Sequence, residues 1–243
     1  MIDLRLGDWR ESLADVGEVD AVIGDWPFSS RVHSGQRAGS STRKTTLCYD
    51  ELCEADTVEA AKAWTARTRY WFLVFSDHLA QRWWESALLG CGWYVFAPVL
   101  AIRTCPTPRM AGDGPTSAAD YITVARRKRR LPANRRGSRP GYYMTKHMNG
   151  NAYAEERYHP GGKDIGMMRE IVRDYTLPGD LIADPVAGGG TTLLAAYQTG
   201  RRAIGAELDP ATHAKAQARL DRAMAQPHLF DPGLQRAVQE RLV

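Results

Sequence analysis

Short apolar runs alternate with longer amphipathic stretches along most of this chain. Seven segments have the composition of buried strands: residues 2–8, 19–25, 70–77, 93–102, 120–126, 180–185 and 201–207. Five segments have helical patterns: residues 55–69, 78–90, 163–176, 191–200 and 210–225. Strands that alternate with helices of about 10 to 15 residues predict an α/β fold, a doubly wound and mostly parallel sheet covered on both faces.

The length and composition suit one globular unit with a sizeable core. The chain has 243 residues, of which 44% are hydrophobic and 25% charged, and we expect a single domain over 1–225 followed by a tail over 226–243. No run approaches the roughly 20 apolar residues of a membrane span, and the first residues lack a signal-peptide pattern. The four cysteines form no CxxC pair. We therefore expect a cytoplasmic protein with reduced thiols and no metal site.

Positive charge is concentrated in one segment. The net charge is +4, but residues 126–139 contain eight Arg and Lys and no acid, so the remainder carries about −4. Such a cluster favours a polyanionic partner, most simply nucleic acid, although a solvated charge run is the plain alternative. The candidate DNA-binding residues here are Arg126, Arg127, Lys128, Arg129, Arg130, Arg135, Arg136 and Arg139.

A second feature is the glycine turn that follows the strand ending at Asp184. Gly188, Gly189 and Gly190 precede a helix, and the next strand ends in Glu207. Glycines allow close backbone approach to a ligand, and an acid about 20 residues further on is placed to bind ribose hydroxyls. The turn lacks the G-x-G-x-x-G fingerprint and the G-K-[ST] of a P-loop. S-adenosylmethionine fits best, because its ammonium and sulfonium groups are cationic and Asp184 supplies negative charge.

These segments together resemble one enzyme family. "DPVAGGGTT" is similar to the D-P-F-x-G-S-G-T-T cofactor motif of amino-group DNA methyltransferases, and "GDWPF" resembles their catalytic D-P-P-Y. "LRLGDWRESL", "HPGGKD" and "RRAIGAELDP" match further family elements. The motif order resembles the circularly permuted beta class, which implies a Rossmann-like fold that binds S-adenosylmethionine. The cofactor-binding residues implied are Asp8, Lys163, Asp184, Pro185, Ala187, Gly188, Gly190, Thr191, Thr192 and Glu207.

The resemblance gives the corner Asp25, Trp26, Pro27 and Phe28 a catalytic role. A base amino group is a poor nucleophile, so the Asp25 carboxylate and the Trp26 carbonyl would accept its hydrogen bonds. Phe28 would stack on the flipped base. The family has Pro where this chain has Trp26, and we expect activity to survive because the carbonyl is kept. An Asp at position 25 favours adenine N6. The alternatives are cytosine N4, an RNA base, or an inactive fold kept for DNA binding.

The family also places a recognition region before the "HP" element. Here it spans about 126–158 and is short, which implies a brief target in double-stranded DNA or help from a second subunit in a homodimer. The loop 29–50 is a candidate for closing over the base. Its basic residues are Arg31, Arg37, Arg43 and Lys44.

Overall fold

The computed structural model describes residues 1–29, 52–104, 106, 114–145 and 162–225. Its strands are β1 (Ile2–Leu6), β2 (Val19–Gly24), β3 (Thr68–Ser76), β4 (Tyr94–Val95), β5 (Val99–Arg103), β6 (Ala119–Arg126), β7 (Tyr142–Thr145), β8 (Leu181–Asp184) and β9 (Arg202–Glu207). The helices are α1 (Trp9–Ser12), α3 (Glu54–Arg67), α4 (Ala80–Gly90), α5 (Ile165–Tyr175), α6 (Thr191–Gln198) and α7 (Pro210–Ala225), with a 3₁₀ turn, η1, at Ala133–Arg135. None of the helices in these ranges combines the length and apolarity needed to cross a bilayer.

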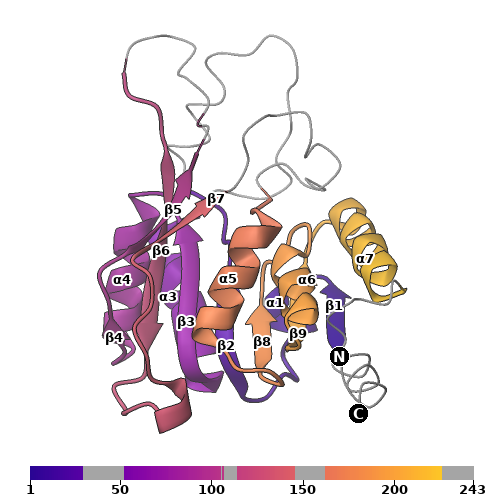
Figure 1. Ribbon diagram of the computed structural model, residues 1–243, viewed down its shortest axis with the longest axis horizontal. Coiled ribbons are helices and arrows are strands. Elements are labelled where there is room, and N and C mark those ends of the chain that lie inside the picture. Colours follow the sequence, from indigo (N-terminus) through magenta and orange to yellow (C-terminus); the bar gives the residue numbers. More distant parts are fainter. Residues whose placement is uncertain (30–51, 105, 107–113, 146–161, 226–243) are drawn as a thin grey trace, which may run out of the picture.

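The described strands form one sheet in the order β1-β9-β8-β2-β3-β6-β5-β7, with β4 paired beside β5 on β6 (Figure 1). Neighbours from β1 to β3 are parallel. β6 is antiparallel to both β3 and β5, and β7 is parallel to β5. The prediction of a mostly parallel sheet is therefore confirmed.

Alternate residues of the central strands enter two separate cores. Val22, Phe72 and Val74 belong to a cluster with residues of α1, α3 and α4. Ile23 and Leu73 belong to another cluster with residues of α5, α6 and α7. Because successive side chains of a strand point to opposite faces, the two helix groups cover opposite faces of the sheet (Figure 1). The doubly wound arrangement is confirmed.

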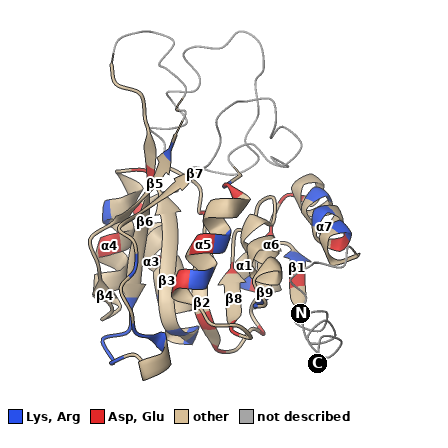
Figure 2. Ribbon diagram, in the orientation of Figure 1, with Lys and Arg blue, Asp and Glu red and all other residues tan. Residues whose placement is uncertain are grey.

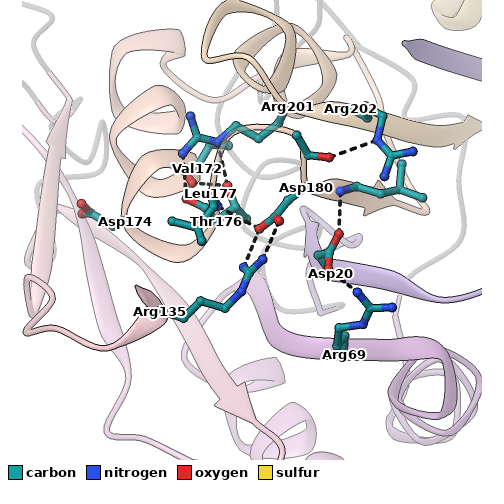
Figure 3. Close-up of polar contacts among 12 residues, drawn as sticks. Asp20, Arg69, Arg135, Val172, Asp174, Thr176, Leu177, Asp180, Arg201 and Arg202 are labelled. Carbon is teal, nitrogen blue, oxygen red and sulfur yellow. Dashed lines mark hydrogen bonds and ion pairs between the residues drawn. The ribbon is translucent and has the colours of Figure 1, made fainter. Parts of the chain in front are cut away.

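A polar network fixes the amino ends of the central strands (Figure 3). The Asp180 carboxylate, just before β8, accepts two hydrogen bonds of 2.6 Å from Arg135 and one of 2.8 Å from the Leu177 N–H. The Asp20 carboxylate of β2 accepts a 2.9 Å hydrogen bond from the Leu181 N–H and lies 3.4 Å from Arg69. These bonds join β2, β8 and η1 at one edge of the sheet and leave the carboxyl edge for other groups.

Two segments differ from the sequence expectation. Residues 93–102 form two strands instead of one, since β4 and β5 both pair with β6, at Tyr94↔Arg126 and Val99↔Ile122. Pro98 lies between them, and proline has no N–H to donate to a ladder. Strand β7 falls in a region without apolar periodicity. The tail 226–243 lies outside the described residues, and the single-domain organisation stays a prediction.

Candidate active site

Four neighbouring strands each carry an acidic residue at or just beyond the carboxyl end. In the order β1, β9, β8 and β2 these residues are Asp8, Glu207, Asp184 and Asp25. The strands are all parallel, so the four acids lie along one edge of the sheet. Asp184 and Asp25 come from directly paired strands, in which Val22 lies opposite Ala183. The structure thus brings together the acids that the sequence assigned to cofactor and to catalysis.

Asp184 is the most deeply buried of these acids, with 2% of its surface exposed. Its carboxylate accepts hydrogen bonds from the Thr192 hydroxyl and, at 3.3 Å, from the Val186 N–H. Burial raises the pKa of Asp184 to about 7 despite these bonds, and the negative charges of Asp25 and Glu207 add to the rise. A positive charge placed beside Asp184 would favour its ionised form.

The glycine turn is held against Glu207. Its carboxylate accepts hydrogen bonds of 2.9 Å from the Gly188 N–H and of 2.9 Å from the Asp209 N–H. Pro185 and Ala187 are buried within the turn. Gly190 has a φ of +71°, a left-handed conformation that glycine adopts without strain, and it is the N-cap of α6. The sequence assignment of a glycine turn between strand and helix is confirmed.

Arg219 of α7 supports the same turn from the other side. Its guanidinium donates to the Gly189 carbonyl at 2.9 Å and to the Thr191 hydroxyl at 3.0 Å, and the residue is 8% exposed. Thr191, expected to bind cofactor, therefore has an intramolecular partner. The arginine fixes the backbone of the turn from a helix that follows it in the chain.

Asp8 lies beside Glu207, because the Gly7 N–H donates to the Glu207 carbonyl at 2.9 Å. Its own carboxylate accepts a 2.8 Å hydrogen bond from the Arg10 N–H and so caps α1. It also forms a 3.0 Å ion pair with the Arg10 guanidinium. Asp8 has both a structural role at the start of α1 and a position at the acidic edge.

The corner after β2 is anchored by Trp26, which is 4% exposed. Its ring packs 4.9 Å from the ring of Trp84 and 6.4 Å from that of Phe72, measured between centroids. The ring also covers Gly24, where an added Cβ would lie 2.3 Å from Trp26. The tryptophan that departs from the family motif therefore packs into the core and leaves Asp25, Pro27 and Phe28 partly exposed.

Asp25 forms an ion pair with Lys163, at 2.8 Å between Oδ2 and Nζ. The lysine side chain is 12% exposed and its Nζ lies 3.5 Å from Asp120 Oδ2 on β6. Burial disfavours the charged amine, but the Asp25 and Asp120 carboxylates outweigh this effect and hold the pKa of Lys163 above its ordinary value. The ammonium also lies 5.1 Å from the ring centroid of Phe28. Lys163, which the resemblance assigned to the cofactor, thus contacts the catalytic corner directly.

Arg103 continues this chain of charges. It forms an ion pair with Asp120 across the β5–β6 pairing and donates to the Ser117 carbonyl at 3.3 Å. The contacts run from Arg103 through Asp120 and Lys163 to Asp25. A carboxylate held in this way keeps one orientation and stays ionised.

Asp77 fixes the far end of the corner. The Ser29 N–H donates to its Oδ2 at 2.7 Å, and the Leu79 and Ala80 N–H groups donate to its Oδ1 at 2.8 and 2.9 Å. Burial alone would raise the pKa of Asp77, but these N–H donors lower it below the ordinary value. One carboxylate therefore joins the segment after Phe28 to the first turn of α4.

Sequence reasoning did not single out Arg103, Asp120, Asp77 or Arg219. Asp120 and Arg103 belong to two strands whose antiparallel pairing sets them side by side, and strand direction is not visible in apolar periodicity. Asp77 had a signal, since an acid between an apolar strand and a helical pattern is typical of an N-cap. Arg219 gave none, because one arginine in an amphipathic helix is usually solvated.

The structure gives three of the predicted DNA-binding arginines intramolecular partners. Arg127 donates to the carbonyls of Thr65, Ala66 and Thr68, and Arg135 pairs with Asp180 (Figure 3). Arg139 donates to the Asp174 carbonyl at 2.8 Å and lies over the ring of Trp71. All three contacts are at the amino edge of the sheet, away from Asp25. A role for these arginines in holding a DNA duplex at the catalytic corner is therefore not supported by their positions.

The remaining basic residues fall into two groups. Arg126, Lys128, Arg129, Arg130 and Arg136 belong to the same amino-edge segment. Arg31, Arg37, Arg43 and Lys44 lie outside the described residues, as does most of the recognition region beyond 145. Among the described residues, no group of three or more His, Cys, Asp and Glu side chains is arranged to hold a metal ion.

The fold and the site define an α/β protein with an acidic cofactor edge beside a carboxylate and an aromatic ring. The chain matches the N6/N4 DNA methylase family over residues 19–218. It therefore belongs to this DNA methylase family, which confirms the resemblance seen in the motifs. It is also 40% identical over 77 residues to the methylase YubD of Escherichia coli strain K12, an alignment that covers 30% of this chain and 34% of YubD.

Solved structures share the fold over almost the whole chain. The complex of M1.HpyAVI with SAM has a TM-score of 0.69 at 21% identity and covers 91% of this chain and 100% of its own. The DNA modification methylase TTHA0409 of Thermus thermophilus, complexed with S-adenosyl-L-methionine, has a TM-score of 0.60 at 20% identity, covering 92% and 94%. The cytosine-N4-specific PvuII DNA methyltransferase has a TM-score of 0.65 at 14% identity, covering 92% and 90%.

Proposed function

We propose that this protein is an S-adenosylmethionine-dependent DNA methyltransferase that methylates the exocyclic amino group of a flipped base, adenine N6 in particular. The observation that carries the proposal is the placement of Asp25 and Asp184 on paired strands at one edge of the sheet. One acid serves the base and the other the cofactor, so donor and acceptor are held side by side. Family membership supports the reaction class. The motif order supports the circularly permuted arrangement.

The residues present fit the cofactor. Asp8, Glu207 and Asp184 give the edge negative charge, and the cofactor carries positive charge on its ammonium and sulfonium groups. Burial and neighbouring acids hold the pKa of Asp184 at about 7, so the site gains most from a cationic ligand. Asp8 and Glu207 would hold the adenosine portion, with the backbone of the glycine turn beside them. Bound S-adenosylmethionine supplies an activated methyl group as its chemistry.

The residues of the corner prepare the base. Asp25 accepts hydrogen bonds from the amino group, which concentrates the lone pair on nitrogen and orients it for transfer. The nitrogen forms a bond to the methyl carbon as the carbon–sulfur bond breaks, and one amino proton leaves through Asp25 to solvent. Phe28 stacks on the base, a contact worth about 1–3 kcal/mol, which offsets part of the cost of flipping. Lys163 keeps Asp25 ionised and fixes its orientation.

The structure also bears on the alternative of an inactive fold. That reading depended on Trp26 in place of the family proline. The Trp26 ring packs against Trp84 and Phe72, so the substitution strengthens the core beneath the corner without filling the space around Asp25 with a large side chain. An inactive protein remains testable, because it would bind DNA tightly without transferring a methyl group.

Product identification tests the proposal. Unmodified DNA is incubated with the protein and S-adenosylmethionine, digested to nucleosides and analysed by mass spectrometry. The expected product is N6-methyladenosine in its deoxy form. N4-methyldeoxycytidine would move the activity to cytosine, methylated ribonucleosides from an RNA substrate would move it to RNA, and no methylated nucleoside would reject the proposed reaction.

A further inference from the structure

The basic run that the sequence analysis connected with nucleic acid lies at the wrong end of the molecule for the catalytic corner. In the β3–β6 pairing Arg126 lies opposite Trp71, whereas Tyr121, near the start of β6, lies opposite Ser76. The run therefore leaves the sheet beside the amino end of β3. In Figure 2 it forms the blue turn below β3 and β4, opposite the carboxyl end of β3.

Two arginines hold this turn in a defined conformation. The Arg126 guanidinium donates to the Arg127 and Arg129 carbonyls at 2.9 and 3.1 Å, and it lies 5.4 Å from the ring centroid of Tyr94. Arg127 donates to the Thr68 carbonyl at 2.8 Å. These bonds tie the turn to itself and to the start of β3. The run is therefore a structured part of the surface.

The next three cations point into solvent. Lys128, Arg129 and Arg130 are exposed, and no carboxylate in the described part of the chain forms an ion pair with them. Lys62 and Lys128 line a groove that also contains Thr65, Gly92, Trp93 and Arg127. Close cations without counter-ions repel one another, and a polyanion relieves that repulsion. We name Lys62, Lys128, Arg129 and Arg130 the amino-edge basic surface.

We propose that the amino-edge basic surface binds the phosphates of a second stretch of DNA, separate from the stretch whose base enters the catalytic corner. This inference rests on the proposed function. Along β3 the register from Thr68 to Val74, which lies opposite Gly24, separates the two places by about 20 Å. Bending one short duplex around the sheet by 40–90° would cost roughly 1–6 kcal/mol. A longer DNA that returns to the protein, or a second duplex, reaches the surface without that cost.

The surface is suited to sequence-independent binding. Its cations are on flexible side chains that contact phosphates well and read bases poorly unless placed in a groove. Such binding keeps the enzyme on DNA between methyl transfers and falls steeply with salt. It adds affinity for long DNA without changing the chemistry at the corner.

The test is a triple variant, Lys128→Gln, Arg129→Gln and Arg130→Gln, compared with wild type on a long duplex and on a short one. A matched control removes three exposed cations from other helices: Arg173, Lys215 and Arg222, each changed to Gln. Binding is measured without cofactor over a range of salt concentrations, and methyl transfer is measured at saturating short duplex. Circular dichroism melting checks that each variant folds.

We expect the triple variant to bind long DNA more weakly, with a salt slope smaller by roughly 0.9 for each phosphate that the removed cations no longer neutralise. Methyl transfer at saturating short duplex stays within about twofold of wild type, and the control variant keeps the wild-type slope. An unchanged slope would show that the run is only solvated charge. Loss of transfer on the short duplex would place the surface on the catalytic duplex, and a wild-type preference for RNA of equal length would contradict DNA as the partner. Because binding is measured without cofactor, failure of the proposed methyl transfer leaves this outcome readable.

Discussion

Lys163 holds the carboxylate of Asp25 at 2.8 Å, although the two residues come from opposite ends of the chain. Asp25 follows β2, and Lys163 precedes α5, which packs on the face of the sheet above it. The pair joins the catalytic corner to the element before the cofactor motif. The orientation of Asp25 therefore depends on a residue that the family resemblance connects with the cofactor.

Replacing Lys163 by methionine is expected to lower kcat for methyl transfer by roughly 10- to 100-fold, because Asp25 loses the cation that orients it. Lys163→Arg keeps a cation and should retain more activity, and Asp120→Asn should give a smaller loss than Lys163→Met. Steady-state kinetics and cofactor titration separate the roles. A normal kcat with weaker cofactor binding would assign Lys163 to the cofactor instead.

Cofactor affinity should rise as the pH increases through about 7. Asp184 has a pKa of about 7 in the free protein, so below that value it is mostly protonated and gives less attraction to a cation. Binding then releases a proton. Calorimetric titration at pH 6 and pH 8 in buffers of different ionisation enthalpy measures this directly, and Asp184→Asn should remove most of the difference. Equal affinity at both pH values would argue against Asp184 as the acid beside the cationic groups.

Asp184 should also reduce stability at neutral pH. Its pKa in the folded protein lies above that of the unfolded chain, so the folded state binds more protons between about pH 4 and 7 and loses stability as the pH rises through that window. Asp184→Asn is expected to raise the free energy of unfolding at pH 8 by roughly 1–3 kcal/mol. Urea unfolding at pH 5 and pH 8 checks this. A variant less stable than wild type at pH 8 would contradict the assignment.

Trp26→Ala should destabilise the protein by about 3–5 kcal/mol, the range for removal of a large buried aromatic side chain. Gly24→Ala should also destabilise it, because the new methyl group overlaps the Trp26 ring. Tyr94→Ala, at an exposed aromatic residue, is the control and should cost much less. Denaturant unfolding measures all three. A small effect of Trp26→Ala would show that the ring is not part of the core.

Asp77→Ala should cost roughly 1–2 kcal/mol, since the first turn of α4 loses its cap, and it should also raise KM for DNA because Ser29 is released. Since burial is outweighed by N–H donors and the pKa of Asp77 is lowered, its contribution is present above the unfolded pKa and is lost as the pH falls through the folded value. Asp77→Asn keeps an acceptor and should lie between wild type and Asp77→Ala. An unchanged KM in Asp77→Ala would remove Asp77 from the catalytic corner.

Much of the fold and the central site followed from the sequence for one physical reason. Parallel strands place their carboxyl ends at one edge, so acids such as Asp25 and Asp184 that directly follow apolar runs must share that edge. Asp120 escaped prediction because β6 runs antiparallel, and its amino end reaches the same edge. The position of Arg135 depends on its tertiary partner, Asp180, which no local pattern reveals.

The same limit applies to single side chains in otherwise recognisable motifs. Trp26 stands in the catalytic motif, yet its ring packs against α4 and β3, and only the assembled core shows where so large a side chain goes. Lys163 was assigned by resemblance, and its contact with Asp25 depends on how α5 lies on the sheet.

The most direct measurement is transfer of labelled methyl groups from S-adenosylmethionine to unmodified DNA by wild type, by Asp25→Ala and by the control Asp15→Ala, an acid of the exposed turn after α1. We predict incorporation by wild type and Asp15→Ala, and a loss of at least about 100-fold in Asp25→Ala, since removal of one oriented acceptor typically costs that much. Equal incorporation by Asp25→Ala and wild type would contradict the account.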